Sequence, residues 1–320
     1  MVSLPGAHVW STPLRSRFRG LEVRSGVLVR GPAGWGEFSP FWDYSDHEAR
    51  RWWAAAREAA DDGFPSPVRD RVPVNVTVPA VGPERAAEIV RASGGCTTAK
   101  VKVAEAGQSA GEEAARLEAV RAALGPTGRV RIDANGAWDV ETAVARLRLL
   151  DRAAGGLEYV EQPCARVEEL AAVRRAVDVP VAADESIRRA EDPMAVVRAE
   201  AADVVVLKVQ PLGGVRAALR VAEETGLPVV VSSALESSVG IAAGVALAAA
   251  LPELPYACGL ATVQLFERDV TDDPLLPVQG FLPVRRVAPS TDALAAMRAD
   301  GETQRRWYER VRAVAAGGRP

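Results

Sequence analysis

The sequence predicts a (β/α) barrel that follows a small α+β unit, and two observations carry this prediction. From Val72 onward, short runs rich in Val alternate with longer runs rich in Ala, Arg and Glu, which gives eight candidate strands and seven candidate helices between them. This alternation is typical of a (β/α) barrel that lacks one regular helix at its end. Residues 1–70 follow no such rhythm and contain five of the seven tryptophans.

The N-terminal unit is expected to hold strands, a hairpin and a helix. Residues 21–30 alternate between apolar and polar side chains as a strand does, a glycine-rich turn follows at 31–34, and 46–61 has the pattern of a helix. The barrel strands are expected at Val72–Val78, Ala99–Val103, Val130–Ala134, Leu157–Glu161, Val179–Asp184, Asp203–Val209, Pro228–Ser232 and Tyr256–Gly259. The helices between them are expected at Pro83–Ser93, Ser109–Leu124, Val140–Ala153, Val167–Val177, Pro193–Glu200, Val215–Thr225 and Ser238–Ala250.

The alternation ends after Gly259. Residues 291–315 have a helical pattern, and we expect them to pack back on the N-terminal unit. An open, doubly wound sheet is the alternative topology, but it requires a glycine fingerprint after the first strand. The sequence at that place, Pro79-Ala80-Val81-Gly82-Pro83, does not match this fingerprint.

Composition excludes several classes of protein. The net charge of −3, from 39 basic and 42 acidic residues, gives no reason to expect nucleic acid or an anionic membrane surface as a partner. No apolar run reaches the ~20 residues of a transmembrane helix, and residues 1–11 do not resemble a secretory signal. Three widely spaced cysteines indicate reduced thiols in the cytoplasm, and two histidines argue against a zinc site or a His-based triad. The sequence does not define the oligomeric state.

Lysine is rare in this chain and occurs at selected places. Of the 39 basic residues only Lys100, Lys102 and Lys208 are lysines, and all three lie in predicted barrel strands. Arg stays protonated in proteins, whereas Lys can lose its proton when burial or a neighbouring cation lowers its pKa. Lys100 and Lys102 point to the same face of their strand, so we expect each to lower the pKa of the other, as a lysine general base requires. The alternative is a pair of solvated lysines on an edge strand.

Three carboxylates follow on the next three strands. Asp133, Glu161 and Asp184 stand at the carboxyl ends, where the chemistry of a βα barrel takes place. Neighbouring strands lie ~4.8 Å apart, so the three side chains can converge on one cation. Oxygen ligands without His or Cys favour Mg²⁺, with Mn²⁺ as a substitute. Lys102 and Lys208 would flank this site and the α-carbon of a bound carboxylate substrate. The alternative reading is that each acidic residue caps the helix that follows it.

Five short motifs in this order resemble the enolase superfamily, in particular its muconate-lactonising-enzyme subgroup. They are Lys100-Val101-Lys102, Asp133-Ala134-Asn135, Glu161-Gln162-Pro163, Asp184-Glu185-Ser186 and Leu207-Lys208-Val209. The resemblance implies a modified TIM-type (β/α)7β barrel over 72–284, an α+β capping domain over 1–71, and a C-terminal segment, 285–320, that packs on the cap.

The resemblance also implies a role for each matching residue. Lys102 would be the general base, Lys100 its neighbour that tunes it, and Lys208 the amine on the opposite face. Asp133, Glu161 and Asp184 would bind Mg²⁺, while Asn135 and Glu185 would orient the ligands, with Glu185 also pairing with Lys208. The residues expected near the distal part of the substrate are Arg15, Phe18, Arg19, Ser232, Ser233, Ser237, Gly259 and Leu260. For the two arginines, a solvated surface position is the alternative.

Several activities share this set of motifs. The segments Ser232–Gly240 and Gly259–Thr262 resemble the o-succinylbenzoate synthases of actinobacterial type, which dehydrate a succinyl-hydroxy-cyclohexadiene carboxylate in menaquinone biosynthesis. N-acylamino-acid racemase and dipeptide epimerase remain alternatives within the subgroup. The alternative from another class is a barrel that binds a metal or an acidic ligand without catalysis, although such a protein has no use for all three lysines.

Overall fold

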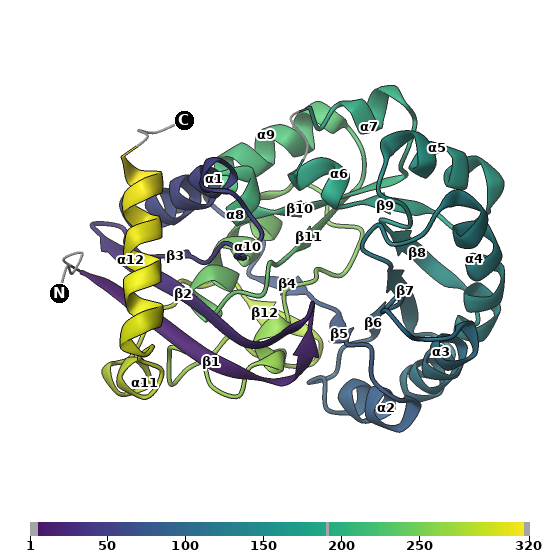
Figure 1. Ribbon diagram of the computed structural model, residues 1–320, viewed down its shortest axis with the longest axis horizontal. Coiled ribbons are helices and arrows are strands. Elements are labelled where there is room, and N and C mark those ends of the chain that lie inside the picture. The colour runs from purple at the N-terminus through teal and green to yellow at the C-terminus, as the bar shows by residue number, and fades with distance from the viewer. Residues whose placement is uncertain (1–5, 190–191, 317–320) are drawn as a thin grey trace.

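The computed structural model describes residues 6–189 and 192–316 of the 320-residue chain. Figure 1 shows a curved parallel sheet wrapped by helices beside a smaller antiparallel sheet that one long C-terminal helix crosses. The expected modified barrel with a capping unit is therefore confirmed. The ends of the first and last predicted segments, 1–5 and 317–320, lie outside the described residues, and the segment boundaries near 71 and 284 stay predictions.

Seven strands of the barrel form a parallel sheet in which each strand pairs with the next one along the chain. They are β5 (Val76–Val78), β6 (Thr98–Lys102), β7 (Arg129–Asp133), β8 (Leu157–Glu161), β9 (Val181–Ala183), β10 (Val204–Lys208) and β11 (Val229–Ser232). The eighth predicted strand, 256–259, makes single bridges only. Its Cys258 bridges Val74 beside β5, and its Gly259 bridges Ser232 of β11, both in parallel, so this segment joins the two edges of the sheet and closes the barrel.

The first predicted strand, 72–78, is split in the structure. Val72 and Pro73 belong to β4 (Arg71–Pro73), which pairs with β12 (Phe281–Pro283) outside the barrel. The backbone then changes partners, because the Val74 N–H donates to the Gly280 carbonyl and the Asn75 N–H to the Cys258 carbonyl, each over 2.9 Å. The barrel strand proper therefore begins only at Val76.

Helices cover the outside of the barrel at the predicted places (Figure 1). They are α2 (Pro83–Arg91), α3 (Ala110–Leu124), α4 (Val140–Ala154), α5 (Val167–Ala176), α7 (Ala195–Arg198), α9 (Val215–Thr225) and α10 (Ser238–Ala250). The sequence pattern missed α6 (Glu185–Arg188), α8 (Val209–Leu212) and the 3₁₀ turn η2 (Thr262–Leu265), since one helical turn is too short to show a period. No helix in the described ranges is long and apolar enough to cross a membrane.

The capping unit is an antiparallel sheet with helices from both ends of the chain. Its elements are β1 (Ala7–Phe18), β2 (Leu21–Gly31), β3 (Gly34–Phe38), α1 (Asp46–Arg57), the π-helical turn η1 (Glu58–Asp62), α11 (Thr291–Ala296) and α12 (Gly301–Ala315). Trp307 of α12 is fully buried, its ring lies 5.8 Å from that of Phe38, and its Nε1 donates to the Ser25 hydroxyl over 3.0 Å. The last helix of the chain thus completes the core of the first sheet.

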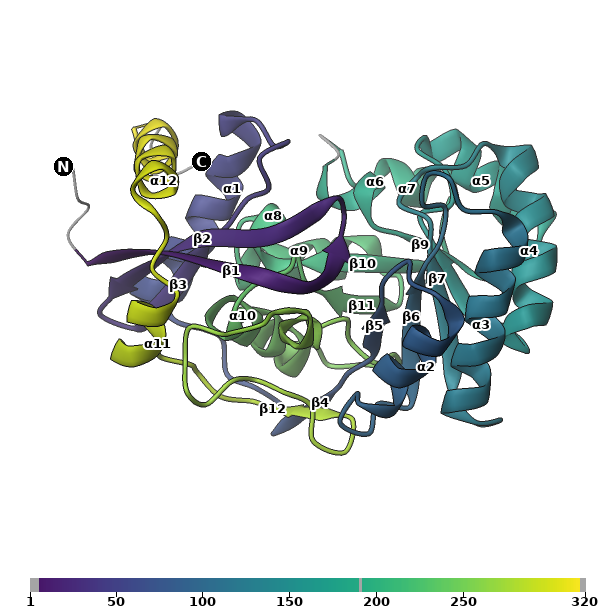
Figure 2. The ribbon, with the colours of Figure 1, turned by 60° about the horizontal axis from the view of Figure 1, so that its bottom comes forward.

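The β1–β2 hairpin brings the cap to the barrel. Phe18 pairs with Leu21, and the two residues between them, Arg19 and Gly20, both have positive φ (52° and 75°). Such a turn matches the right-handed twist of the two strands and keeps the hairpin tight. Figure 2 shows the hairpin extending from the capping sheet toward the barrel strands, and its tip shares a cavity wall with Lys102. The hairpin therefore places Phe18 and Arg19 at the barrel mouth.

Candidate active site

Strand register brings the predicted lysines and carboxylates to one level of the barrel. Lys102 on β6 is the register partner of Asp133 on β7, which is in turn the partner of Glu161 on β8. Glu161 pairs with Ala182 on β9, so Asp184 follows two residues later on the same face. Lys208 ends β10, the next strand of the sheet. The side chains singled out from the sequence therefore lie together at the carboxyl ends of five consecutive strands.

Each carboxylate in this cluster faces an ammonium group. Lys100 Nζ lies 2.9 Å from Glu161 Oε1 and 3.1 Å from Asp133 Oδ2, so a single cation bridges two carboxylates. Lys102 Nζ lies 2.5 Å from Asp133 Oδ2, and Lys208 Nζ lies 2.5 Å from Asp184 Oδ2. All of these side chains are buried except that of Lys102, which is partly exposed. The two outer lysines thus flank the carboxylates from opposite ends of the row.

The pKa values differ from the expectation that adjacent amines depress each other. Burial lowers the pKa of Lys100, but Glu161 and Asp133 outweigh it, so this pKa lies well above its usual value. Burial lowers the pKa of Lys208, and Arg188 adds to this effect, so its pKa is lowered despite Asp184. The pKa of Glu161 is raised to about 7 by burial and by the charge of Asp133. Lys100 is therefore held in its protonated form, and its role as the neighbour that tunes Lys102 stays a prediction.

Asp133 and Asp184 are ionised. Burial alone would raise the pKa of Asp133, but Lys102 and Lys100 outweigh it and hold this pKa well below its usual range. The pKa of Asp184 is likewise lowered, because Arg188 and Lys208 outweigh the effect of burial. Two of the three carboxylates thus carry full negative charge, while Glu161 is the one that lacks sufficient positive charge around it.

Arg188 is a member of the cluster that the sequence analysis missed. Its guanidinium donates to Asp184 Oδ1 over 2.9 Å, to Glu185 Oε1 over 2.5 Å, and to the hydroxyl of Tyr44 in the cap. Arg188 lies one helical turn after Asp184, so α6 brings the two side chains together. Glu185, which we expected to pair with Lys208, pairs with Arg188 instead, and it accepts from the Asn135 amide over 3.2 Å.

The donor set suits a hard divalent cation. Within the described residues, no three His, Cys, Asp or Glu side chains are arranged as they stand to hold a metal ion, because the carboxylates turn toward the lysines. The ligand chemistry nevertheless fits Mg²⁺, since Asp133, Glu161 and Asp184 are buried, lie on adjacent strands and offer only oxygen. Glu161 supports this fit, because a dication beside it would supply the positive charge that its raised pKa shows to be lacking.

A narrow cavity of about 30 Å³ opens onto this cluster. Its lining includes eight predicted site residues from the barrel, together with Phe18 and Arg19 from the hairpin. The barrel residues are Lys100, Lys102, Asp133, Asn135, Lys208, Ser232, Ser233 and Gly259, and the unpredicted lining residues are Phe41, Thr77, Ala234, Leu235 and Thr262. The cap therefore contributes Phe41 as well as the hairpin, a contact across the fold that no local pattern reveals.

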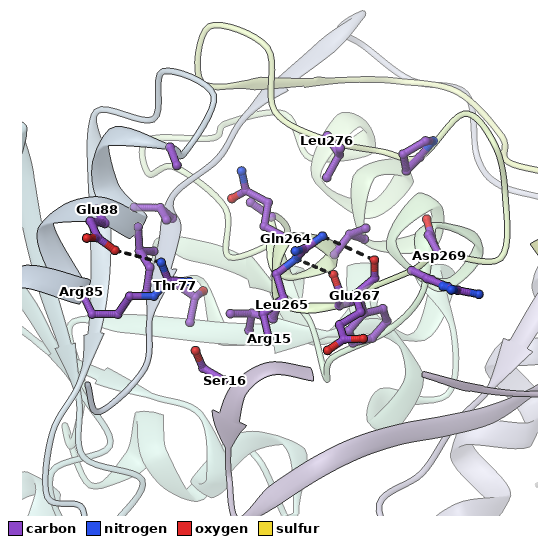
Figure 3. Close-up of a pocket in the computed structure, with 18 residues that line it drawn as sticks. Arg15, Ser16, Thr77, Arg85, Glu88, Gln264, Leu265, Glu267, Asp269 and Leu276 are labelled. Carbon is purple, nitrogen blue, oxygen red and sulfur yellow. Dashed lines mark hydrogen bonds and ion pairs between the residues drawn. The ribbon is translucent and has the colours of Figure 1, made fainter. Parts of the chain in front are cut away.

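Three residues expected near the substrate lie elsewhere. Arg15 lines a different cavity of about 530 Å³, between α2 and the segment 261–276 (Figure 3). There its guanidinium donates to the carbonyls of Phe266 over 2.8 Å and Glu267 over 3.4 Å. Ser237 is fully buried and donates to Glu37, while Leu260 is buried and would meet a Cβ added at Gly244. Ser237 is the N-cap of α10 and Leu260 packs against Gly244 of the same helix, so neither side chain lines the cavity.

The strand ends of this barrel carry a pair of lysines, three carboxylates and an opposing lysine, and an antiparallel sheet caps the barrel. This is the architecture of an enolase-like enzyme. Residues 83–289 match the family described as enolase C-terminal domain-like, and residues 9–60 match the one described as enolase N-terminal domain-like. The muconate lactonizing enzyme of Pseudomonas fluorescens has a similar structure, with a TM-score of 0.78 and 21% identity over 92% of this chain and 98% of that one.

Two curated relatives resemble the chain much more closely in sequence. The o-succinylbenzoate synthase of Thermobifida fusca is 71% identical over 307 residues, which cover 96% of this chain and 95% of the relative. The o-succinylbenzoate synthase of Mycolicibacterium smegmatis is 54% identical over 95% of this chain and 93% of the relative. The chain belongs to the enolase superfamily and, within it, to the o-succinylbenzoate synthase family.

Proposed function

We propose that this protein is a hydro-lyase that converts 2-succinyl-6-hydroxy-2,4-cyclohexadiene-1-carboxylate to 2-succinylbenzoate, in the cytoplasm, as a step of menaquinone biosynthesis. Membership in a family of o-succinylbenzoate synthases supports the reaction. The observation that carries the mechanism is the position of Lys102 and Lys208 at opposite ends of the buried carboxylates, because a substrate held there has an amine on either side.

Asp133, Glu161 and Asp184 are the proposed ligands of Mg²⁺, with Mn²⁺ as a substitute. The bound ion would supply positive charge next to the substrate carboxylate. Lys100, which contacts Asp133 and Glu161, holds these two side chains in place. Asn135 accepts from Lys102 Nζ over 2.7 Å and so orients the base. Lys100 and Asn135 thus have supporting roles, and Lys102 is the lysine that is partly exposed at the cavity.

Lys102 is the proposed general base. It takes the proton from the carbon α to the carboxylate, and the electrons of the broken C–H bond form an enediolate. The enediolate then expels the hydroxyl group, which leaves as water with the proton that Lys102 carries, and the ring becomes aromatic. Lys208 stays protonated on the opposite face, where its ammonium lies over the ring and stabilises negative charge. Burial lowers the pKa of Lys208, and the contact with Asp184 opposes this effect and favours the protonated form.

Arg19 is the proposed partner of the distal carboxylate of the substrate. Its guanidinium lies at the hairpin tip, 4.6 Å from the centre of the Phe41 ring, and it lines the cavity. Arg15 is unsuited to this role, because its guanidinium donates to main-chain carbonyls in the other cavity. Ser233 and Thr262, whose hydroxyls lie 2.8 Å apart, complete the polar lining on the barrel side.

The test follows the ultraviolet absorbance of the cyclohexadiene substrate with purified protein, first with Mg²⁺ and then with excess EDTA. We expect rapid loss of the diene only with metal. Lys102→Ala should lower kcat by about 10²–10⁴-fold, which is the usual contribution of a general base. A wild-type protein without turnover would refute the synthase assignment, and a Lys102→Ala variant with full activity would refute the assigned base.

Lys208→Arg separates the synthase from the racemases and epimerases of the same subgroup. A racemase needs Lys208 to accept and donate a proton, so an arginine there should abolish racemisation. A synthase needs only a cation at this position, so the variant should keep measurable turnover of the diene. A non-catalytic binding barrel, in contrast, would keep its ligand affinity in Lys102→Ala and show no turnover in any variant.

A further inference from the structure

One wall of the active-site cavity has a strained backbone. Ser233, Ala234 and Leu235 line the cavity after the end of β11, and Leu235 has a φ of 62°, in the left-handed region. A leucine in this region costs free energy and persists only where surrounding contacts hold it. The conformation of this wall therefore depends on side chains that bind its backbone.

Arg24 supplies those contacts from the capping domain. It lies on β2, is only 3% exposed, and donates from Nε to the Leu235 carbonyl over 3.0 Å and from Nη2 to the Ala234 carbonyl over 3.3 Å. The same guanidinium lies 4.4 Å from the centre of the Phe41 ring and donates to the Ser39 carbonyl. Phe41 lines the cavity as well, so one side chain supports two of its walls without lining it.

Two buried carboxylates complete the support. Glu236 accepts from the Ala234 N–H over 2.6 Å, and Glu37 of β3 accepts from the N–H groups of Ser237 and Gly240 over 3.1 and 3.2 Å. Glu37 therefore binds the first turn of α10, where unpaired N–H groups favour a carboxylate. Arg24 and Glu37 belong to the cap, and each also binds backbone groups of the barrel. Burying polar and charged groups is costly compared with apolar packing, so this cluster needs a reason other than stability.

We propose that Arg24 is a positioning residue that sets the shape of the cavity wall facing the distal part of the substrate, and so determines which substrates are accepted. This inference rests on the proposed function. Arg24 acts through the Ala234–Leu235 backbone and through Phe41, and it does not touch the reacting atoms.

The experiment compares Arg24→Lys with Arg69→Lys. Arg69 also holds barrel carbonyls, those of Ala248, Leu251 and Pro252 at 2.5, 2.7 and 3.1 Å, but at the far end of α10. Both variants lose the fork of a guanidinium, and both retain its charge. We expect Arg24→Lys to raise KM for the diene and the Kd for 2-succinylbenzoate by about tenfold, a typical effect of losing a charged hydrogen bond, with a smaller change in kcat. Arg69→Lys should leave both constants unchanged.

A second readout tests selectivity directly. Deuterium exchange into N-acylamino acids measures how far each variant accepts a different distal group, and the ratio of kcat/KM for the diene to this exchange should fall in Arg24→Lys alone. Urea unfolding of both variants verifies that they are folded. Equal KM and Kd changes in the two variants, or a fall in kcat alone, would overturn the inference. A wild type that neither turns over the diene nor binds 2-succinylbenzoate would overturn the proposed function, and the inference with it.

Discussion

Lys100 offers the sharpest test of how the carboxylate cluster is held together. Lys100→Met removes the one ammonium that lies within 3.1 Å of both Asp133 and Glu161, and it leaves two buried carboxylates without this partner. Breaking a buried ion pair from one side costs about 3–5 kcal/mol. We therefore expect the free energy of unfolding in EDTA to fall by this amount, measured by urea denaturation.

Magnesium and pH should both reduce this loss. Mg²⁺ replaces the missing positive charge, so it should stabilise Lys100→Met more than the wild type. Acidic pH should also reduce the loss of stability, because protonation removes the unpaired charge of Glu161. The pKa of Glu161 is raised to about 7 from 4.5, and we expect it to rise further without Lys100. A raised folded pKa gives stability that is present below about pH 4.5 and lost as pH rises through the folded value, so the deficit of the variant should shrink toward acidic pH.

The matched control is Arg146→Met, which removes a cation 2.9 Å from the buried Glu113 on the outside of the barrel. It should also destabilise the protein, but Mg²⁺ should not narrow its deficit, because Glu113 lies outside the proposed metal site. The reasoning is refuted if Lys100→Met unfolds like the wild type in EDTA, or if Mg²⁺ stabilises Lys100→Met and Arg146→Met equally.

Three further predictions concern other parts of the protein. Arg188→Met leaves Asp184 and Glu185 without their shared guanidinium, so the Mg²⁺ affinity measured by titration calorimetry should fall by about 10–100-fold. A variant that binds Mg²⁺ as tightly as the wild type would show that Arg188 does not orient Asp184. Trp307→Ala removes a fully buried indole and should cost about 3–5 kcal/mol in urea unfolding, whereas a loss under about 1 kcal/mol would show that α12 is dispensable for the cap. The three cysteines are free and buried, and burial raises the pKa of each thiol, so a chromogenic thiol reagent should react with them only after unfolding; fast reaction of the native protein would contradict their burial.

Local patterns in the sequence were sufficient to predict the barrel and its charged strand ends. Lys102, Asp133 and Glu161 lie at the same level because each ends a strand in a sheet whose order follows the chain, and that order is implied by the βα alternation. Their roles in binding and catalysis stay predictions. The signal was the rarity of lysine among many arginines, because a buried lysine can lose its proton whereas an arginine stays protonated.

Contacts between distant segments were beyond the same reasoning. Tyr44 meets Arg188 across 144 positions, and Arg24 meets Leu235 across 211. No period or motif links such pairs, because the docking of cap on barrel decides them. Arg15 illustrates the same limit, for a strand pattern gives the spacing of Arg15 and Arg19 but not which of them faces the barrel mouth. An arginine four residues after Asp184 was the one available signal for Arg188, and it requires knowing that a helix starts there.

The dependence of the first sheet on the last helix has a consequence for synthesis on the ribosome. Phe38 and Ser25 emerge from the ribosome long before Trp307, which packs against both and follows Ser25 by 282 positions. At about 5–20 residues per second, the N-terminal sheet waits on the order of tens of seconds with an apolar face and two open edges uncovered. During this time the nascent chain is exposed to aggregation and is a natural client for chaperones. The codons for α12, and not those for the sheet itself, therefore commit the cap to its folded form.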